Sequence, residues 1–156
     1  MKKTNKGFSL VELIIVIAIM AILAAALAPA LIRYIDKSRR SSDLSNAGLL
    51  QSAAQSAAAD EKAYSEIATK IPASGEQTVL SATDGGAWGL DSNVSTATTF
   101  LNEFTSTAGK NAPGVKLKKG VTGGTGWSVK VTAEGGFTVY VGSSQLIPSA
   151  QGPWAN

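Results

Sequence analysis

The chain has 156 residues, a length that suits one domain better than two, and a formal net charge of +3 at pH 7. It contains neither cysteine nor histidine, which excludes disulfides, thiolate metal sites, the usual zinc ligand sets and Ser-His or Cys-His nucleophile pairs. We therefore expect a protein that is not an enzyme and that holds no cofactor or metal.

The positive charge lies around the N-terminal segment. Without Lys2, Lys3 and Lys6, the chain keeps eleven basic residues, which equals its eleven acidic ones. From Asp60 onward, seven basic residues face eight acidic residues. The C-terminal part thus lacks the charge pattern of a polyanion-binding surface, and a nucleic-acid partner is not supported.

Residues 13–32 form a run of twenty uncharged and almost wholly apolar residues. As a helix this run is about 30 Å long, which matches the hydrocarbon thickness of a bilayer. A secretory signal peptide fits poorly, because the run is longer than the usual ~7–15 residues and Pro29 would follow the small-x-small site at 26–28. A plain membrane anchor explains the length but leaves Glu12 unexplained.

Glu12 is a carboxylate at the start of this apolar helix. Such a residue costs up to about 2.5–3.5 kcal/mol at the centre of a membrane, and less near its edge. Two ordinary explanations are a shallow position at the interface and a favourable interaction with the positive end of the helix dipole. The residues around Glu12 suggest a third.

Residues 2–12 read Lys-Lys-Thr-Asn-Lys-Gly-Phe-Ser-Leu-Val-Glu. This stretch resembles the processing site of type IV prepilins and pseudopilins, and the resemblance covers about the first 40 residues. It implies that residues 1–7 are a leader, that a membrane peptidase cuts between Gly7 and Phe8, and that Phe8 becomes N-methylated. It also implies a helix kink at Pro29.

The spacing has a physical reason. Cleavage after Gly7 would give Phe8 a free α-amino group, and Phe8 and Glu12 are i and i+4 on one helix face. In the family, this carboxylate is thought to pair with the amine of a neighbouring subunit during assembly. Pairing offsets the cost of burying the charge, so Glu12 is expected to be an assembly residue.

Pro29 has a simpler interpretation as well. A proline in a membrane helix is often only a tolerated kink, although it also marks a point where the helix bends or loosens, with Gly48 as a second one.

Basic residues flank the apolar run on both sides, so their count does not fix the topology of the helix in the membrane. The resemblance places the N-terminus in the cytoplasm.

After the apolar segment 8–35, the sequence predicts an amphipathic continuation of the helix over 36–60. Apolar residues recur there at three- and four-residue spacing and form one stripe: Leu44, Ala47, Leu50, Ala54 and Ala57. Residues 61–156 are expected to form a globular domain. Its first part, 61–113, suggests a short helix at 63–70 and another from Ser95 to about Ser106 with Leu101 and Phe104 inward.

The last third alternates apolar and polar residues with period two. This predicts strands near 115–118, 127–132 and 137–141, joined by hairpin connections at 120–126 and 133–136. The expected fold is α+β, with the long helix packed on an antiparallel sheet of three to four strands. The resemblance implies the same type IV pilin fold.

Four patterns in the distal part have weaker functional interpretations. Residues 123–126 suggest a phosphate loop but lack its lysine, so a hairpin connection is favoured. Asp84, Asp91 and Glu103 fit no calcium motif, and the sequon at 93–95 is a weak signal for sugar. A basic strip on the outer sheet face is weighed against an ordinary soluble face, which is favoured. Its members are Lys116, Lys118, Lys119 and Lys130.

The predicted function is that of a structural subunit of an extracellular filament. Its expected partners are other pilin subunits, the prepilin peptidase and methylase, the pilus assembly machinery and, before assembly, the cytoplasmic membrane. The alternatives are a pseudopilin or minor pilin of a secretion or DNA-uptake system, and a membrane-anchored binding domain that never polymerises. One departure from many family members is the absence of a C-terminal disulfide.

Overall fold

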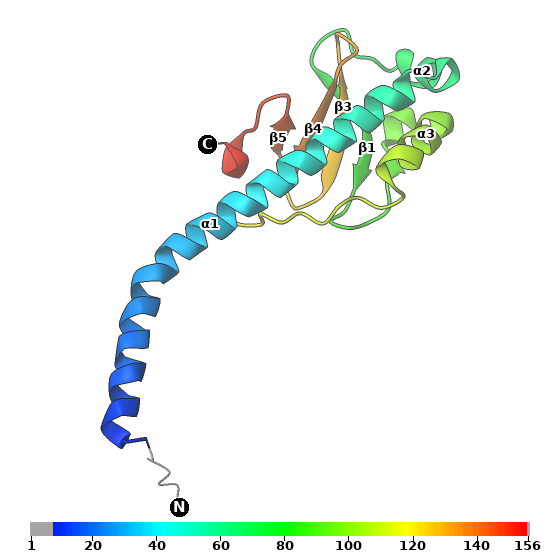
Figure 1. Ribbon diagram of the computed structural model, residues 1–156. Coiled ribbons are helices and arrows are strands. Elements are labelled where there is room, and N and C mark those ends of the chain that lie inside the picture. The colour runs from blue at the N-terminus through cyan, green and yellow to red at the C-terminus, as the bar shows by residue number, and fades with distance from the viewer. Residues whose placement is uncertain (1–7, 156) are drawn as a thin grey trace, which may run out of the picture. The chain divides into compact units, whose positions relative to one another are not determined.

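The computed structural model describes residues 8–155 and divides the chain into two compact units (Figure 1). One unit extends up to Ser38, and the other runs from Arg39 to the C-terminal end. The predicted leader, residues 1–7, lies outside the described residues. The second unit, called the globular unit below, contains the sheet and the core.

One helix, α1 (Leu10–Ala58), contributes to both units. The predicted end near residue 60 is therefore confirmed to within two residues. Every residue from Phe8 to Ile35 is exposed. Pro29 lies inside the helix, and Gly48 lies in it with open space where a side chain would be.

The globular unit contains a five-stranded antiparallel sheet, which confirms the α+β class and adds strands to the three or four expected. The spatial order is β2-β1-β3-β4-β5. The strands are β1 (Glu76–Ala82), β2 (Gly89–Leu90), β3 (Trp127–Thr132), β4 (Phe137–Val141) and β5 (Ser144–Ile147). The two predicted strands at 127–132 and 137–141 are β3 and β4.

The central pair shows how the alternating sequence becomes a two-faced sheet. Along β3, Trp127, Val129 and Val131 are buried, and the residues between them are half-buried. β3 and β4 pair in register, with Val129 opposite Val139, through the predicted turn at 133–136. In that turn Gly135 has φ 78°, a conformation that favours glycine.

The second half of α1 lies across one face of this sheet (Figure 1). Four of its buried residues are alanines: Ala47, Ala53, Ala54 and Ala57. Leu50 is also buried in the common core, and the Gln51 side chain donates a 2.8 Å hydrogen bond to the Phe137 carbonyl on β4. The predicted apolar stripe is thus the packing face.

Two short helices complete the unit: α2 (Glu61–Ala68) and α3 (Thr98–Ala108), preceded by the 3₁₀ turn η1 (Ser92–Val94). Asp60 caps α2 by accepting the Ala63 amide at 2.8 Å. On α3, Phe100 and Phe104 are buried and Leu101 is half-buried, so the inward face is turned slightly from the one expected.

The expected strand at 115–118 is wrong. Its alternation is real, because Val115 and Leu117 are 2 % and 3 % exposed, but the segment pairs with no strand. Instead, the amides of Lys116 and Leu117 bind the Asp43 carboxylate. Consequently, residues 120–126 join no hairpin. Strands β1 and β5, and the C-terminal 3₁₀ turn η2 (Gly152–Trp154), were not anticipated.

Candidate functional site

The N-terminal turn of α1 places Glu12 against its own chain. One carboxylate oxygen of Glu12 accepts the Ser9 amide at 2.9 Å, three residues earlier. Ser9-Leu-Val-Glu12 is therefore half of a capping box, in which the glutamate at the third helical position satisfies an amide that the helix leaves free. This motif was readable from the sequence, yet the interpretation of Glu12 as an assembly residue overlooked it.

Phe8 precedes this turn and is 79 % exposed. Cleavage after Gly7 and methylation of Phe8 remain predictions, because Gly7 lies outside the described part of the chain. Ser9 and Glu12 belong to a single hydrogen-bonded turn, so the Glu12 carboxylate is already oriented. Because α1 begins at Leu10, Phe8 lies before the helix, and the expected i, i+4 placement of Phe8 and Glu12 on one helix face is wrong for this chain.

The segment behind Glu12 presents an uninterrupted apolar surface. Sixteen large hydrophobic side chains from Leu10 to Ile35 are at least 39 % exposed, and most of the other residues of this segment are alanines. By length and composition α1 could cross a membrane. A soluble monomer rarely exposes more than a few hundred Å² of contiguous apolar surface, so this segment requires apolar surroundings.

Pro29 lies within the same segment and is exposed. A proline at this place removes one backbone donor from the helix and leaves an acceptor without its usual partner. The helix is nevertheless assigned as continuous from Leu10 to Ala58. A kink at Pro29 remains a prediction.

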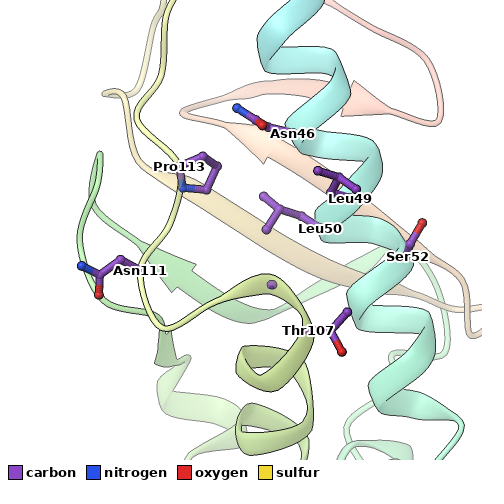
Figure 2. A pocket seen from close by; sticks show the side chains of 8 residues that line it. Asn46, Leu49, Leu50, Ser52, Thr107, Asn111 and Pro113 are labelled. Carbon is purple, nitrogen blue, oxygen red and sulfur yellow. The ribbon is translucent and has the colours of Figure 1, made fainter.

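In the globular unit, a shallow groove of about 260 Å³ runs between α1 and the segment around the end of α3 (Figure 2). Leu49 stands at its rim, 66 % exposed, beside the buried Leu50. Pro113 and Asn111 lie on the opposite side. After Ile35, Leu49 and Tyr64 are the large hydrophobic side chains that remain exposed among the described residues.

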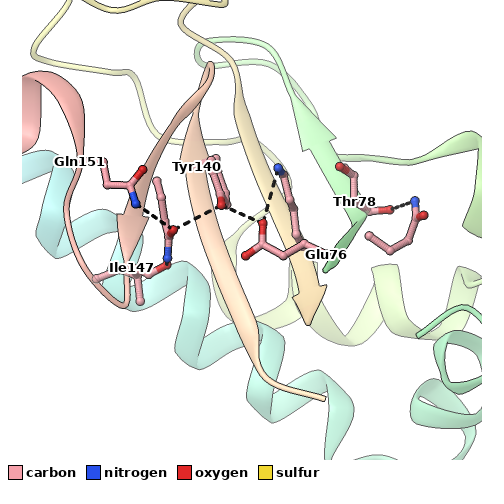
Figure 3. Close-up of polar contacts among 8 residues, drawn as sticks. Glu76, Thr78, Tyr140, Ile147 and Gln151 are labelled. Atoms are coloured by element: carbon pink, nitrogen blue, oxygen red, sulfur yellow. Dashed lines mark hydrogen bonds and ion pairs between the residues drawn. The ribbon is translucent and has the colours of Figure 1, made fainter. Parts of the chain in front are cut away.

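A polar cluster covers the outer face of the sheet (Figure 3). The Tyr140 hydroxyl donates to Glu76 at 2.7 Å, and the Lys130 ammonium lies 3.7 Å from the Glu76 carboxylate and 3.8 Å from the Tyr140 ring centroid. Burial, followed by the hydrogen bond and charge of Glu76, raises the pKa of Tyr140 to about 12. The polar groups of Tyr140, Glu76 and Lys130 thus have partners within the cluster itself.

The proposed basic strip does not form on this face. Lys130 is engaged in the cluster just described, and the Lys118 ammonium pairs with Asp84 at 2.6 Å. Lys116 and Lys119 are exposed but belong to the irregular segment before β3, not to a strand. An ordinary soluble face, the favoured alternative, describes these lysines better.

Asp84, Asp91 and Glu103, weighed as calcium ligands, are not brought together. Within residues 8–155, no three such side chains cluster closely enough to hold a metal ion. Asp84 accepts the Val115 amide at 2.8 Å, and hydrogen bonds from Lys118 and from that amide lower the pKa of Asp84. Asp91 caps η1 by accepting the Asn93 amide.

The glycine-rich segment 123–126 packs against the turn between β4 and β5. A side chain at Gly142 would collide with the Thr122 and Gly124 carbonyls, and the Ser143 amide donates to the Thr122 carbonyl at 3.0 Å. The glycines therefore allow two backbone segments to touch. These contacts indicate that the segment is a connection packed against the neighbouring turn, and they give no indication of a phosphate site.

Two further residues of structural importance were missed. Asp43 was not counted in the predicted stripe, but it precedes Ala47 by four residues and Leu50 by seven, which is the spacing of the stripe itself. It is fully buried. Glu66 was not considered at all, because its partners, the Thr99 and Phe100 amides, lie 33 and 34 residues away.

Comparisons with known proteins agree with the N-terminal pattern. Residues 2–28 match the model of the prokaryotic N-terminal methylation motif. The chain is 33 % identical over 120 residues to a type IV major fimbrial protein, FimA, of Dichelobacter nodosus. The aligned region covers 72 % of this chain and 77 % of that protein. It is also 39 % identical over 67 residues to the type IV major pilin protein PilA of Myxococcus xanthus, covering 43 % of this chain and 30 % of the relative.

No solved structure matches the chain significantly. The fold is nonetheless the one expected for pilins, a long N-terminal helix on an antiparallel sheet, and the similarity to FimA extends well beyond the apolar helix into the globular unit. On these grounds the chain belongs to the type IV pilin family.

Proposed function

We propose that this chain is the structural subunit of an extracellular type IV pilus-like filament, matured by cleavage between Gly7 and Phe8 and assembled through the helix that follows. The observation that carries this proposal is the apolar surface from Leu10 to Ile35, exposed in full and headed by the single carboxylate of Glu12. Membrane lipid covers such a surface before assembly, and neighbouring subunits cover it afterwards.

The role of Glu12 follows from the groups around it. A carboxylate has two oxygens and can accept several hydrogen bonds, and in the single chain one of them is used by the Ser9 amide. Cleavage would add the Phe8 ammonium just before the start of this helix. In the proposed assembly step, the amine of an incoming subunit binds the remaining acceptor sites of Glu12, and this pairing offsets the cost of burying the charge among apolar helices.

The proposal also assigns partners and places. The precursor is a single-pass protein of the cytoplasmic membrane with its N-terminus on the cytoplasmic side, where the prepilin peptidase cuts it and methylates Phe8. The pilus assembly machinery then transfers the subunit to the filament. The relatives are named as a major fimbrial protein and a major pilin protein, which supports a structural role and gives no reason to expect catalysis.

Mass spectrometry of the mature N-terminus tests the processing step. We expect the filament protein to begin at N-methylated Phe8, and Gly7→Ala to accumulate as full-length precursor, because the peptidase then lacks the residue that it requires. A mature N-terminus at another residue, or normal cleavage of Gly7→Ala, contradicts the assignment.

Substitution of Glu12 tests the assembly step separately. Glu12→Gln keeps the size of the side chain and an acceptor for Ser9 but removes the charge, and Glu12→Ala removes both. Both variants should insert into the membrane at least as well as the wild type, since a charge has been removed from an apolar helix. Filament yield should fall strongly in both. Normal yield from Glu12→Gln would exclude a role for charge pairing.

A pseudopilin or minor pilin is the alternative within the family. The names of the relatives, major fimbrial protein and major pilin protein, favour the major subunit. Quantification of filaments sheared from the cell surface distinguishes the two, because a major subunit dominates the sheared material and a minor one is a trace component. Mature protein that never enters such filaments would indicate the membrane-anchored binding domain.

A further inference from the structure

The C-terminal segment of the chain folds back onto α1 within the globular unit (Figure 1). Beyond β5, residues 148–155 include the turn η2, and the Gln151 amide donates to the Gln145 carbonyl on β5 at 2.8 Å. Within this segment Trp154 is only 1 % exposed. A short terminal segment that buries a tryptophan is held in place by specific contacts.

Asp43 on α1 receives that tryptophan. Its carboxylate has no exposed surface and accepts three hydrogen bonds: the Lys116 amide at 2.9 Å, the Leu117 amide at 2.9 Å and the Trp154 indole N–H at 3.1 Å. None of these donors carries a charge. Such a buried anion is stable only while its donors are present, so Asp43 joins three segments that are far apart in the sequence.

Arg40 holds the same terminus one turn earlier on the helix. Its guanidinium donates to the Ala155 carbonyl at 3.0 Å. Arg40 and Asp43 are i and i+3 and therefore share one face of α1. Asp43 is also the first buried residue of the helix in chain order, and the next is Ala47.

We propose that residues 148–155 form a latch that determines where α1 becomes part of the globular unit. With the latch closed, α1 is anchored from Arg40 onward, which agrees with the start of the compact unit at Arg39. With the latch open, Asp43 keeps two of its three donors, Leu44 keeps its partial packing on the core, and the first fully buried apolar residue is Ala47, so the attachment of α1 is weakened over about two turns. The chain contains no cysteine, so this closure is non-covalent and reversible.

The three tryptophans provide a matched test of this latch. The Trp154 N–H binds Asp43, the Trp127 N–H binds the Pro113 carbonyl at 2.7 Å, and the buried Trp88 N–H has no partner among the described residues. Trp154→Phe removes a donor to a charged acceptor and keeps a large ring. Trp88→Phe makes the same chemical change where no hydrogen bond is lost, and serves as the control.

Hydrogen–deuterium exchange of the full chain in detergent micelles, read by mass spectrometry, reports the opening. In Trp154→Phe we expect the amides of residues 148–155 and of 40–47 to exchange about tenfold faster, by the same factor, because one opening event exposes both. The amides of residues 50–57 should keep their wild-type rates. Trp88→Phe should accelerate neither segment relative to the rest of the globular unit.

Arg40→Ala provides a second variant in which the tryptophan stays in place. It should accelerate exchange in the same two segments by about threefold, since a less buried contact is lost. Faster exchange of 148–155 alone, with 40–47 unchanged, would overturn the proposal, because the terminus would then open without releasing the helix. Equal acceleration throughout the globular unit would also overturn it, since the effect would then be global unfolding.

Discussion

The two halves of α1 have the same secondary structure and opposite relations to the rest of the chain. From Leu10 to Ile35 every residue is exposed, and the side chains are mainly large aliphatic ones. From Arg39 to Ala58 one face is buried in the chain's own core, and that face is mostly alanine. Large residues thus mark the half that the rest of the chain leaves exposed, and small ones mark the half that packs on the sheet.

The difference also applies to the polar residues of the two halves. Asp43 is fully buried and has three donors from its own chain, whereas Glu12 has one such donor and stands at the start of an exposed helix. The second half is therefore complete within one molecule. The first half exposes a continuous apolar surface that the rest of its own chain leaves uncovered.

Removal of Asp43 should have the largest effect on the globular unit. Asp43→Ala leaves three donors without an acceptor in the core, and we expect the free energy of unfolding to fall by about 3–5 kcal/mol. Thermal or urea unfolding in detergent, followed by near-ultraviolet circular dichroism, measures the change. Asp91→Ala is the control, since it removes a cap at the surface and should cost about 0.5–1 kcal/mol. Equal losses in the two variants would show that burial of Asp43 is unimportant.

Two adjacent leucines sharpen the contrast between inward and outward positions. Leu50 is 2 % exposed in the core, so Leu50→Ala should cost about 2–5 kcal/mol of unfolding free energy. Leu49, 66 % exposed at the rim of the groove in Figure 2, should change it by less than about 0.5 kcal/mol when replaced by alanine. The same unfolding experiment compares them, and a large loss from Leu49→Ala would contradict the division of the helix into two faces.

The sequence predicted these two halves well because helical periodicity is a local signal. The apolar run, the stripe from Leu44 to Ala57 and the alternation in β3 and β4 all repeat within a few residues of the chain. The segment at 115–118 also alternates, but alternation reports only that successive side chains point to opposite sides. Whether such a segment pairs depends on distant residues, and here Asp43 binds its amides in place of a neighbouring strand.

The same reasoning explains what was missed at the site. The Ser9–Glu12 bond spans three residues and was available from the sequence as a capping motif. The bond from Trp154 to Asp43 spans 111 residues, and no pattern in one sequence connects two positions that far apart. The inner strand β1 and the edge strand β5 were missed because they contain polar residues that break a clear alternation, as Glu76-Gln-Thr and Ser144-Gln do.

A second glutamate allows the comparison to be extended to helix N-termini. Glu66 accepts the Thr99 and Phe100 amides at the start of α3, much as Glu12 accepts the Ser9 amide. Its partners belong to the globular unit, so we expect Glu66→Gln to lower the unfolding free energy by about 1 kcal/mol at neutral pH. Glu12→Gln should leave the unfolding of the globular unit unchanged. A similar loss from both would contradict the independence of the two helix starts.

The pH dependence of this effect has a definite sign. Hydrogen bonding to Thr99, together with the Phe100 amide, outweighs burial and lowers the pKa of Glu66. A lowered pKa contributes stability that is present above the ordinary glutamate pKa of about 4.3 and is lost as the pH falls through the folded value. The stability difference between wild type and Glu66→Gln should therefore shrink as the pH is lowered from 6 to about 3. A difference that stays constant over this range would exclude the carboxylate as its source.

The smallest expected effect concerns the outer face of the sheet, where the polar groups of the globular unit satisfy one another. Because burial and Glu76 raise the pKa of Tyr140 to about 12, its neutral form contributes stability that is complete below about pH 10 and is lost as the pH rises through 12. Ultraviolet titration should show one of the three tyrosines ionising near pH 12, and Tyr140→Phe should remove that step. Glu76→Gln should move the step to lower pH, because it removes the negative charge that accepts the hydroxyl proton at 2.7 Å. If the step does not move, burial alone raises the pKa, and the cluster in Figure 3 contributes little to this face.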